Sequence, residues 1–180
     1  MASLQSADRN ARRSAELDLA DVLRWCVAQL RPVAEEREIA LTADLEPACG
    51  VVVEDHMKML FSNVLSNAVT YSHRGGRIEV RCAQSNGNYP VVTVLDHGIG
   101  ISPESLPRIF EAYYRAEEAA RHRKESTGLG LAIVRQIAET YGIGVHVDSA
   151  PGRGTRFTLH FRRPPHPTGE TPEGGRLWPT

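Results

Sequence analysis

FSNVLSNAVTYS, residues 61–72, carries the clearest structural signal in this chain. It completes a segment, residues 55–71, whose apolar residues recur at the spacing of one helix face, so we expect an amphipathic helix there. Asn63 and Asn67 lie four positions apart and therefore share a face of that helix, beside its apolar stripe. Amide oxygens are ligands that Mg²⁺ accepts together with substrate phosphates and water. Two ordinary asparagines on a helix surface are the alternative interpretation.

A second informative segment is VLDHGIGI, residues 94–101. Asp96 ends an apolar strand, where a carboxylate can accept a hydrogen bond from an amino group in a cleft. Gly98 and Gly100 let the backbone approach a ligand closely or adopt a positive φ. The same residues also suit an ordinary junction between a strand and a turn, because Asp is favoured in turns.

Glycines also mark the start of a later helix. The segment STGLGL, residues 126–131, opens a helix that we expect over 129–141. The first N–H groups of a helix have no partner within it and can bind phosphate oxygens. An ordinary glycine-rich helix start is the alternative. The segment GRGT, residues 152–155, taken alone predicts only a hairpin turn.

The remaining pattern predicts an α+β fold, a two-layer sandwich of a sheet and helices. Pro32 lies within the first helical pattern, and we expect it to kink that helix or to end its regular hydrogen bonding. In chain order we expect a helix over 19–37, strands over 39–45 and 51–53, the helix over 55–71, a hairpin of 77–84 and 91–95, a loop over 97–107, the helix over 129–141, and strands over 143–148 and 155–162.

In their order and spacing these segments resemble the catalytic, ATP-binding domain of bacterial two-component sensor histidine kinases, a branch of the GHKL (HATPase) family with the Bergerat fold. The matching motifs are FSNVLSNAVTYS for the N box, LDHGIG for the G1 box, IFEAYYR for the F box, STGLGLAIV for the G2 box and GRGTRF for the last glycine box. The likeness covers about residues 17–162. It implies a mixed five-stranded sheet with three main helices on one face, and ATP held beneath a flexible lid at about 115–127.

The resemblance implies roles at the phosphate end of ATP. Asn67 is expected to bind Mg²⁺, with Asn63 assisting at the metal or the phosphates, and Arg115 is expected to reach the phosphates. These three are the catalytic residues that it implies. The residues expected to cradle the phosphates are Ser126, Thr127, Gly128, Leu129, Gly130 and Leu131.

The resemblance also implies how the base is held. Asp96 is expected to accept the exocyclic amine of adenine, which distinguishes adenine from guanine. Tyr71 is expected to line the nucleotide pocket, and Thr155 to support the adenine end, directly or through water. The other residues that it implies are Gly98, Gly100 and Ile101 in the adenine wall and Phe110, Tyr113 and Tyr114 at the base of the lid.

The activity that the resemblance implies is that of an ATP:protein-histidine phosphotransferase. In this family the acceptor histidine belongs to a separate dimerisation domain, and no histidine of this chain lies in the sequence context of an acceptor. Relatives that hydrolyse ATP rapidly place a glutamate at the position of Asn63. An amide cannot take a proton from water, so we expect weak hydrolysis at most.

Two alternatives stay open. Thr70 stands where the N box often carries a cation, and Ser126 stands where the G2 box has a glycine. Both favour a non-catalytic nucleotide-binding or interaction module of the same fold. A serine kinase of the anti-sigma type is the other alternative, although such compact relatives lack so long a segment after the F box.

The composition limits the class of partner. The 180 residues carry a formal net charge of −1, which does not favour binding to nucleic acid. No stretch has the roughly 20 apolar residues of a membrane span, so we expect no membrane contact by this domain. The three cysteines are far apart, which fits a reducing cytoplasm whether or not the parent kinase is anchored in the inner membrane.

The ends of the chain differ from its middle. We expect residues 1–16 to be a poorly ordered lead-in from a dimerisation domain, and residues 163–180, rich in proline and glycine, to be a disordered tail. The ATP-binding domain would then occupy 17–162. We expect an isolated monomer that serves the dimerisation (phosphoacceptor) domain of its parent kinase and, indirectly, a response regulator.

Overall fold

The computed structural model describes residues 14–85, 89–116 and 127–161. The expected lead-in up to residue 13, most of the expected lid (117–126, with Ser126) and the expected tail lie outside these residues. Within them, helices and strands follow one another in the order that the sequence predicts, except for one additional strand at the beginning.

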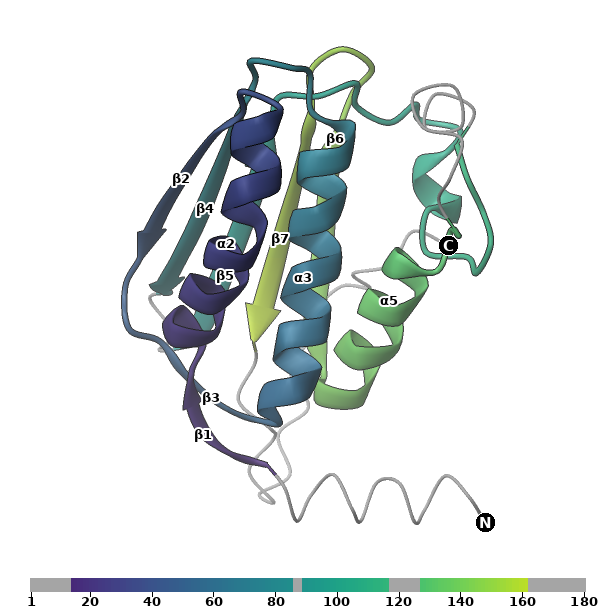
Figure 1. Ribbon diagram of the computed structural model, residues 1–180. Coiled ribbons are helices and arrows are strands. Elements are labelled where there is room, and N and C mark those ends of the chain that lie inside the picture. The colour runs from purple at the N-terminus through teal and green to yellow at the C-terminus, as the bar shows by residue number, and fades with distance from the viewer. Residues whose placement is uncertain (1–13, 86–88, 117–126, 162–180) are drawn as a thin grey trace.

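A five-stranded mixed sheet forms one layer of the molecule (Figure 1). Its strands are β2 Ala40–Leu45, β4 Arg77–Gln84, β5 Pro90–Asp96, β6 Ile143–Ser149 and β7 Thr155–Phe161. They lie in the order β2-β4-β5-β7-β6. The β2–β4 pair is parallel and the other three pairs are antiparallel. The expected mixed sheet is therefore confirmed.

Three helices form the second layer, on one face of the sheet (Figure 1). They are α2 Leu19–Glu36, α3 Glu54–Tyr71 and α5 Gly130–Tyr141, and a 3₁₀ turn, Leu106–Arg108, lies in the loop before α5. None of the helices within 14–85, 89–116 and 127–161 has the length and apolarity that crossing a membrane requires.

The core lies between these two layers. Phe61 and Leu65 of α3 are each 1% exposed, which agrees with the helical spacing of the apolar residues. On β5, Val92 and Val94 are buried while the residues between them are partly exposed, as expected for a strand that presents every second side chain to the helices. This packing confirms the two-layer sandwich.

The first helix ends one residue before the expected end at 37, with Pro32 inside it. α2 continues through Pro32 to Glu36. A proline removes the hydrogen bond to the carbonyl four residues earlier, which here belongs to Ala28. Ala28 and Pro32 are both exposed, so water can satisfy that carbonyl, and the buried Ala34 keeps the last turn against the core.

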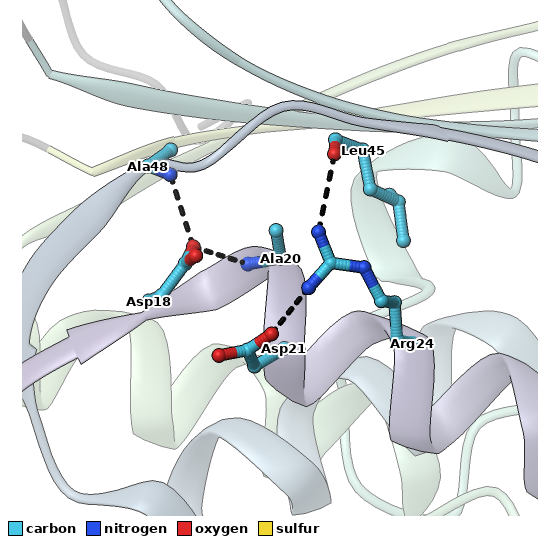
Figure 2. Close-up of polar contacts among 6 residues, drawn as sticks. All are labelled: Asp18, Ala20, Asp21, Arg24, Leu45 and Ala48. Atoms are coloured by element: carbon cyan, nitrogen blue, oxygen red, sulfur yellow. Dashed lines mark hydrogen bonds and ion pairs between the residues drawn. The ribbon is translucent and has the colours of Figure 1, made fainter.

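The additional strand, β1 Ala15–Asp18, pairs antiparallel with β3 Cys49–Val52 in a separate two-stranded sheet. Among the described residues the first strand thus begins at Ala15, two residues before the expected domain start. Figure 2 shows how Asp18 fixes this corner: its Oδ1 accepts hydrogen bonds from the amides of Ala20 (2.9 Å) and Ala48 (3.0 Å). Asp18 therefore caps α2 and ties it to the segment before β3.

Candidate functional site

A pocket of about 60 Å³ lies where α3 and the start of α5 meet the ends of β5 and β7. Its lining residues are Asn67, Tyr71, Asp96, Ile99, Gly100, Ile101, Leu131, Thr155 and Phe157. Most of them belong to the motifs singled out in the sequence. Ile99 and Phe157 were not predicted, although Phe157 follows Thr155 by two positions on the same strand and so shares its face.

Asp96 is the acidic group of this pocket. It is 4% exposed, and its Oδ1 accepts a hydrogen bond from the Gly98 amide at 2.9 Å. Burial raises the pKa of Asp96 to about 6, against the opposing effect of hydrogen bonds from the backbone of Gly98 and Thr155. At pH 7 the group is therefore mainly ionised, and it offers the pocket a carboxylate acceptor that is largely shielded from solvent.

The loop after Asp96 is pressed against the end of α3. Gly98 forms an isolated β-bridge with Ser72, and the Ile99 amide donates to the Tyr71 carbonyl oxygen at 3.1 Å. A Cβ on Gly98 would lie 2.1 Å from that oxygen. The close approach leaves no room for a side chain, which is the reason for a glycine at this position.

On its other side the loop contacts the β6–β7 hairpin. Gly100 has φ +68°, and a Cβ there would lie 1.9 Å from the Ala150 carbonyl oxygen, so both its conformation and its surroundings require glycine. The Ile101 amide donates to Ser149 Oγ at 2.9 Å. Ser149 was not predicted as a site residue. Its contact spans 48 residues of chain, and no local pattern marks it.

Asn67 lines the pocket, and Asn63 lies one turn earlier on the same face of α3 without lining it. Asn63 Nδ2 donates to the Met59 carbonyl at 2.8 Å, which leaves Oδ1 on the other side, toward Gly130. A Cβ on Gly130 would lie 2.8 Å from that Oδ1, so the N box and the G2 box are in contact here. The described residues contain no cluster of three or more His, Cys, Asp or Glu side chains. This donor set fits Mg²⁺ that shares its coordination with phosphates and water, not a metal held by protein ligands alone.

None of the residues expected at the base of the lid lines the pocket. Phe110 is 6% exposed and belongs to the core. Tyr114 Oη donates to Ser105 Oγ at 3.2 Å. The Tyr113 side chain is 75% exposed, while its amide donates to the Gly128 carbonyl at 3.0 Å. That backbone contact joins the two ends of the expected lid.

Several predicted residues have no described contact with the pocket. Ser126 lies outside the described residues, and Thr127 is exposed. Arg115 is partly buried but does not line the pocket. Gly98 supports the pocket loop without lining it, whereas Gly128, Leu129 and Gly130 bring the start of α5 next to Asn63.

A larger hollow of about 330 Å³ lies elsewhere, between α2 and β2. Its lining residues are Arg24, Val27, Ala28, Arg31, Ala43 and Leu45. It has no carboxylate, no glycine-rich loop and no helix start. For this reason the smaller pocket, where the motif residues meet, is the candidate functional site.

A family model described as histidine kinase-, DNA gyrase B-, and HSP90-like ATPase matches residues 52–165, a stretch that contains every residue of the pocket. The chain belongs to this family. Within the family it is similar to sensor histidine kinases. YkoH of Bacillus subtilis is 39% identical over 145 residues, which are 81% of this chain and 31% of YkoH. The chain thus spans about a third of the length of that curated relative.

Solved structures of this ATPase family agree with the fold. The mycobacterial sensor histidine kinase MprB gives a TM-score of 0.72 at 28% identity, over 82% of this chain and 97% of that one. Full-length ShkA in complex with AMPPNP gives 0.69 at 25% identity, over 82% of this chain and 30% of ShkA. The resemblance to the ATP-binding catalytic domain of two-component histidine kinases is therefore confirmed, and so is the expected arrangement of sheet and helices.

Proposed function

We propose that this chain binds Mg·ATP in the described pocket and donates the γ-phosphoryl group to a histidine on a separate dimerisation domain. The observation that carries the proposal is the buried carboxyl group of Asp96 in a pocket that Asn67 also lines, with Asn63 next to the start of α5. We call the side of Asp96 the closed end and the side of Asn67, Asn63 and the start of α5 the open end. An adenine amine and a chain of phosphates match these two ends.

The closed end binds the base. The Asp96 carboxylate accepts a hydrogen bond from the exocyclic amine of adenine, and Thr155 supports the same edge directly or through water. Tyr71 and the loop from Gly98 to Ile101 enclose the ring. The carboxylate is desolvated in the free chain, so a partner that donates to it recovers part of that cost.

The open end binds the phosphates. α5 begins at Gly130 with no side-chain cap at Leu129, so its first N–H groups are available to phosphate oxygens, and the helix dipole favours an anion there. Asn67 would hold Mg²⁺, with Asn63 Oδ1 beside it. The metal supplies charge neutralisation between the phosphates. Arg115 would also reach the phosphates.

Phosphoryl transfer, and not hydrolysis, is the reaction that this residue set supports. Asn63 is an amide and takes no proton from an attacking water molecule. The chain's contribution is to position ATP and to stabilise charge on the transferred group. The phosphoacceptor domain would be part of a longer parent kinase, which would act through a response regulator. The free thiols of Cys26, Cys49 and Cys82 fit a cytoplasmic site of action.

The test is transfer in trans. The chain is incubated with γ-labelled ATP, Mg²⁺ and the dimerisation domains of relatives such as YkoH, and label on histidine is recognised by its stability to alkali and lability to acid. We expect transfer by the unaltered chain and a loss of at least tenfold in Asn67→Ala, whereas Ser66→Ala, on the exposed side of α3, keeps it. Nucleotide binding without transfer to any acceptor would favour the non-catalytic module.

A further inference from the structure

The hydroxyl group of Ser149 joins three parts of the chain at the closed end of the pocket. Its Oγ lies 2.9 Å from the Ile101 amide nitrogen, 2.8 Å from the Gly154 carbonyl oxygen and 3.0 Å from Thr155 Oγ1. Ser149 ends β6, directly opposite Thr155 in the pairing with β7. It does not line the pocket, so its effect on a ligand has to pass through these neighbours.

The chemistry of the three partners sets the direction of each hydrogen bond. An amide N–H such as that of Ile101 can only donate, and the Gly154 carbonyl can only accept. Ser149 therefore gives its single proton to Gly154. The contact with Thr155 then requires Thr155 to be the donor, and Ser149 has its proton and both lone pairs in use.

This direction decides what Thr155 presents to the pocket. Thr155 lines the pocket and is 6% exposed, and its hydroxyl proton points away, toward Ser149. Its oxygen can therefore only accept. Asp96 lies opposite Thr155 in the pairing of β5 with β7, and its carboxylate also only accepts. The edge formed by these two residues thus consists of acceptors.

We propose that Ser149 is a specificity-determining residue, which makes the pocket prefer a 6-aminopurine to a 6-oxopurine by holding the Thr155 hydroxyl group as an acceptor. The inference rests on the proposed function, because it concerns the base of the same nucleotide. An exocyclic amine offers N–H donors to this edge. An oxo group would place a third acceptor against the other two, and neither Asp96 nor Thr155 could donate a hydrogen bond to it.

The test compares ADP with inosine 5′-diphosphate (IDP), whose base has an oxo group in place of the amine. Titration calorimetry of the full chain with Mg²⁺ gives the ratio of the Kd for IDP to the Kd for ADP. In Ser149→Ala the Thr155 hydroxyl is free to turn and donate to the oxo group, so we expect the ratio to fall roughly fivefold or more. Ser149→Thr keeps the hydroxyl group and is expected to restore the ratio.

Two further variants separate specificity from mere support of the loop. Ser102 lies next to Ile101, and its Oγ donates to Ser105, so Ser102→Ala makes the same chemical change without touching Thr155 and should keep the original ratio. Thr155→Val removes the hydroxyl that Ser149 is proposed to orient. In that background Ser149→Ala should no longer change the ratio, because both changes act through one proton.

Equal weakening of ADP and IDP in Ser149→Ala would overturn the inference, since a supporting residue affects both nucleotides alike. A change of ratio that persists in the Thr155→Val background would also overturn it. If Ser149→Ala does not fold, Ser149→Cys, with a thiol that bonds weakly, carries the same comparison. If the unaltered chain binds neither nucleotide, the proposed function itself is refuted, and this inference with it.

Discussion

At pH 7 the Asp96 carboxylate costs the folded chain free energy. Burial raises its pKa from the ordinary value of 3.8 to about 6. Between these two values the folded chain keeps a proton that the unfolded chain releases, so the free energy of unfolding falls as the pH rises through this window and is level above it. The difference of roughly two pKa units corresponds to on the order of 3 kcal/mol.

Asp96→Asn should therefore stabilise the chain in the absence of nucleotide. The amide keeps an oxygen for the Gly98 N–H and has no charge to desolvate, so we expect the free energy of unfolding at pH 7 to rise by ~1–3 kcal/mol. In this variant the free energy of unfolding, measured with urea at pH 4.5, 6 and 7.5, should also depend much less on pH than in the unaltered chain. Asp44→Asn, at an exposed position of β2, is the control and should change stability by less than about 0.5 kcal/mol. Equal or lower stability of Asp96→Asn at pH 7 would contradict this view of the carboxyl group.

Some residues of the pocket and of its supporting contacts could be predicted from the sequence, and others could not, for a physical reason. Asp96, Gly98 and Gly100 were predictable because a strand end and close backbone approach demand particular residue types within a few positions. Ser149 was not, because its hydroxyl acts on Ile101, 48 residues earlier, and on a hairpin partner. A serine beside a turn has no local feature that distinguishes it from any other.

Among the helices, α3 has an end that depends on a residue of another segment. Its last turn contains no basic residue. Instead Arg37, directly after α2, donates to the carbonyl oxygens of Val69, Thr70 and Ser72. A guanidinium group there satisfies carbonyls that have no partner within the helix and complements the dipole. Arg37 thus holds the helix end against which the pocket loop packs.

Arg37→Met should destabilise the fold, because it removes these hydrogen bonds and keeps much of the apolar stem. We expect a loss of ~1–3 kcal/mol in urea unfolding, with Arg37→Lys in between. Arg74→Ala breaks only the exposed ion pair with Glu38 and serves as the control, with a change below about 0.5 kcal/mol. An Arg37→Met chain as stable as the control would show that the contacts at the end of α3 contribute nothing.

The elements that the sequence missed are short or depend on distant contacts. β1 has only four residues, and its pairing with β3 crosses about thirty residues of chain, so its own pattern is too brief to predict a strand. The end of α2 at Glu36 was predicted to within one residue, whereas the effect of Pro32 inside the helix depends on which face of α2 meets water. The long amphipathic segments, such as α3, were predictable because their period is repeated several times.

On the scale of the whole molecule, the pocket joins the two layers. Asn67, Tyr71 and Leu131 come from the helices, while Asp96 and Thr155 come from the sheet. A bound nucleotide should therefore stabilise the fold globally. At 100 times its Kd, ADP with Mg²⁺ is expected to add about 2.7 kcal/mol to the free energy of unfolding. Hydrogen exchange should slow together in α3 and β5. Slowing confined to one layer would contradict a pocket built from both.

The layered arrangement itself was predictable through the resemblance, and only in part from the residues. Periodicity shows which segments are helices and strands, but the parallel pairing of β2 with β4 beside antiparallel neighbours follows from no single segment. The resemblance carried by the motifs implies that topology. In the structure, the N box at the end of α3 contacts the G1 loop at the end of β5.

The central claim is that this pocket binds an adenine nucleotide through Asp96. Titration calorimetry with ADP and a non-hydrolysable ATP analogue, with and without Mg²⁺, tests it most directly. We predict micromolar binding that is tighter with Mg²⁺ for the analogue and roughly 10–100-fold weaker in Asp96→Asn. Binding that is unchanged in Asp96→Asn, or no binding at millimolar nucleotide, would contradict the claim.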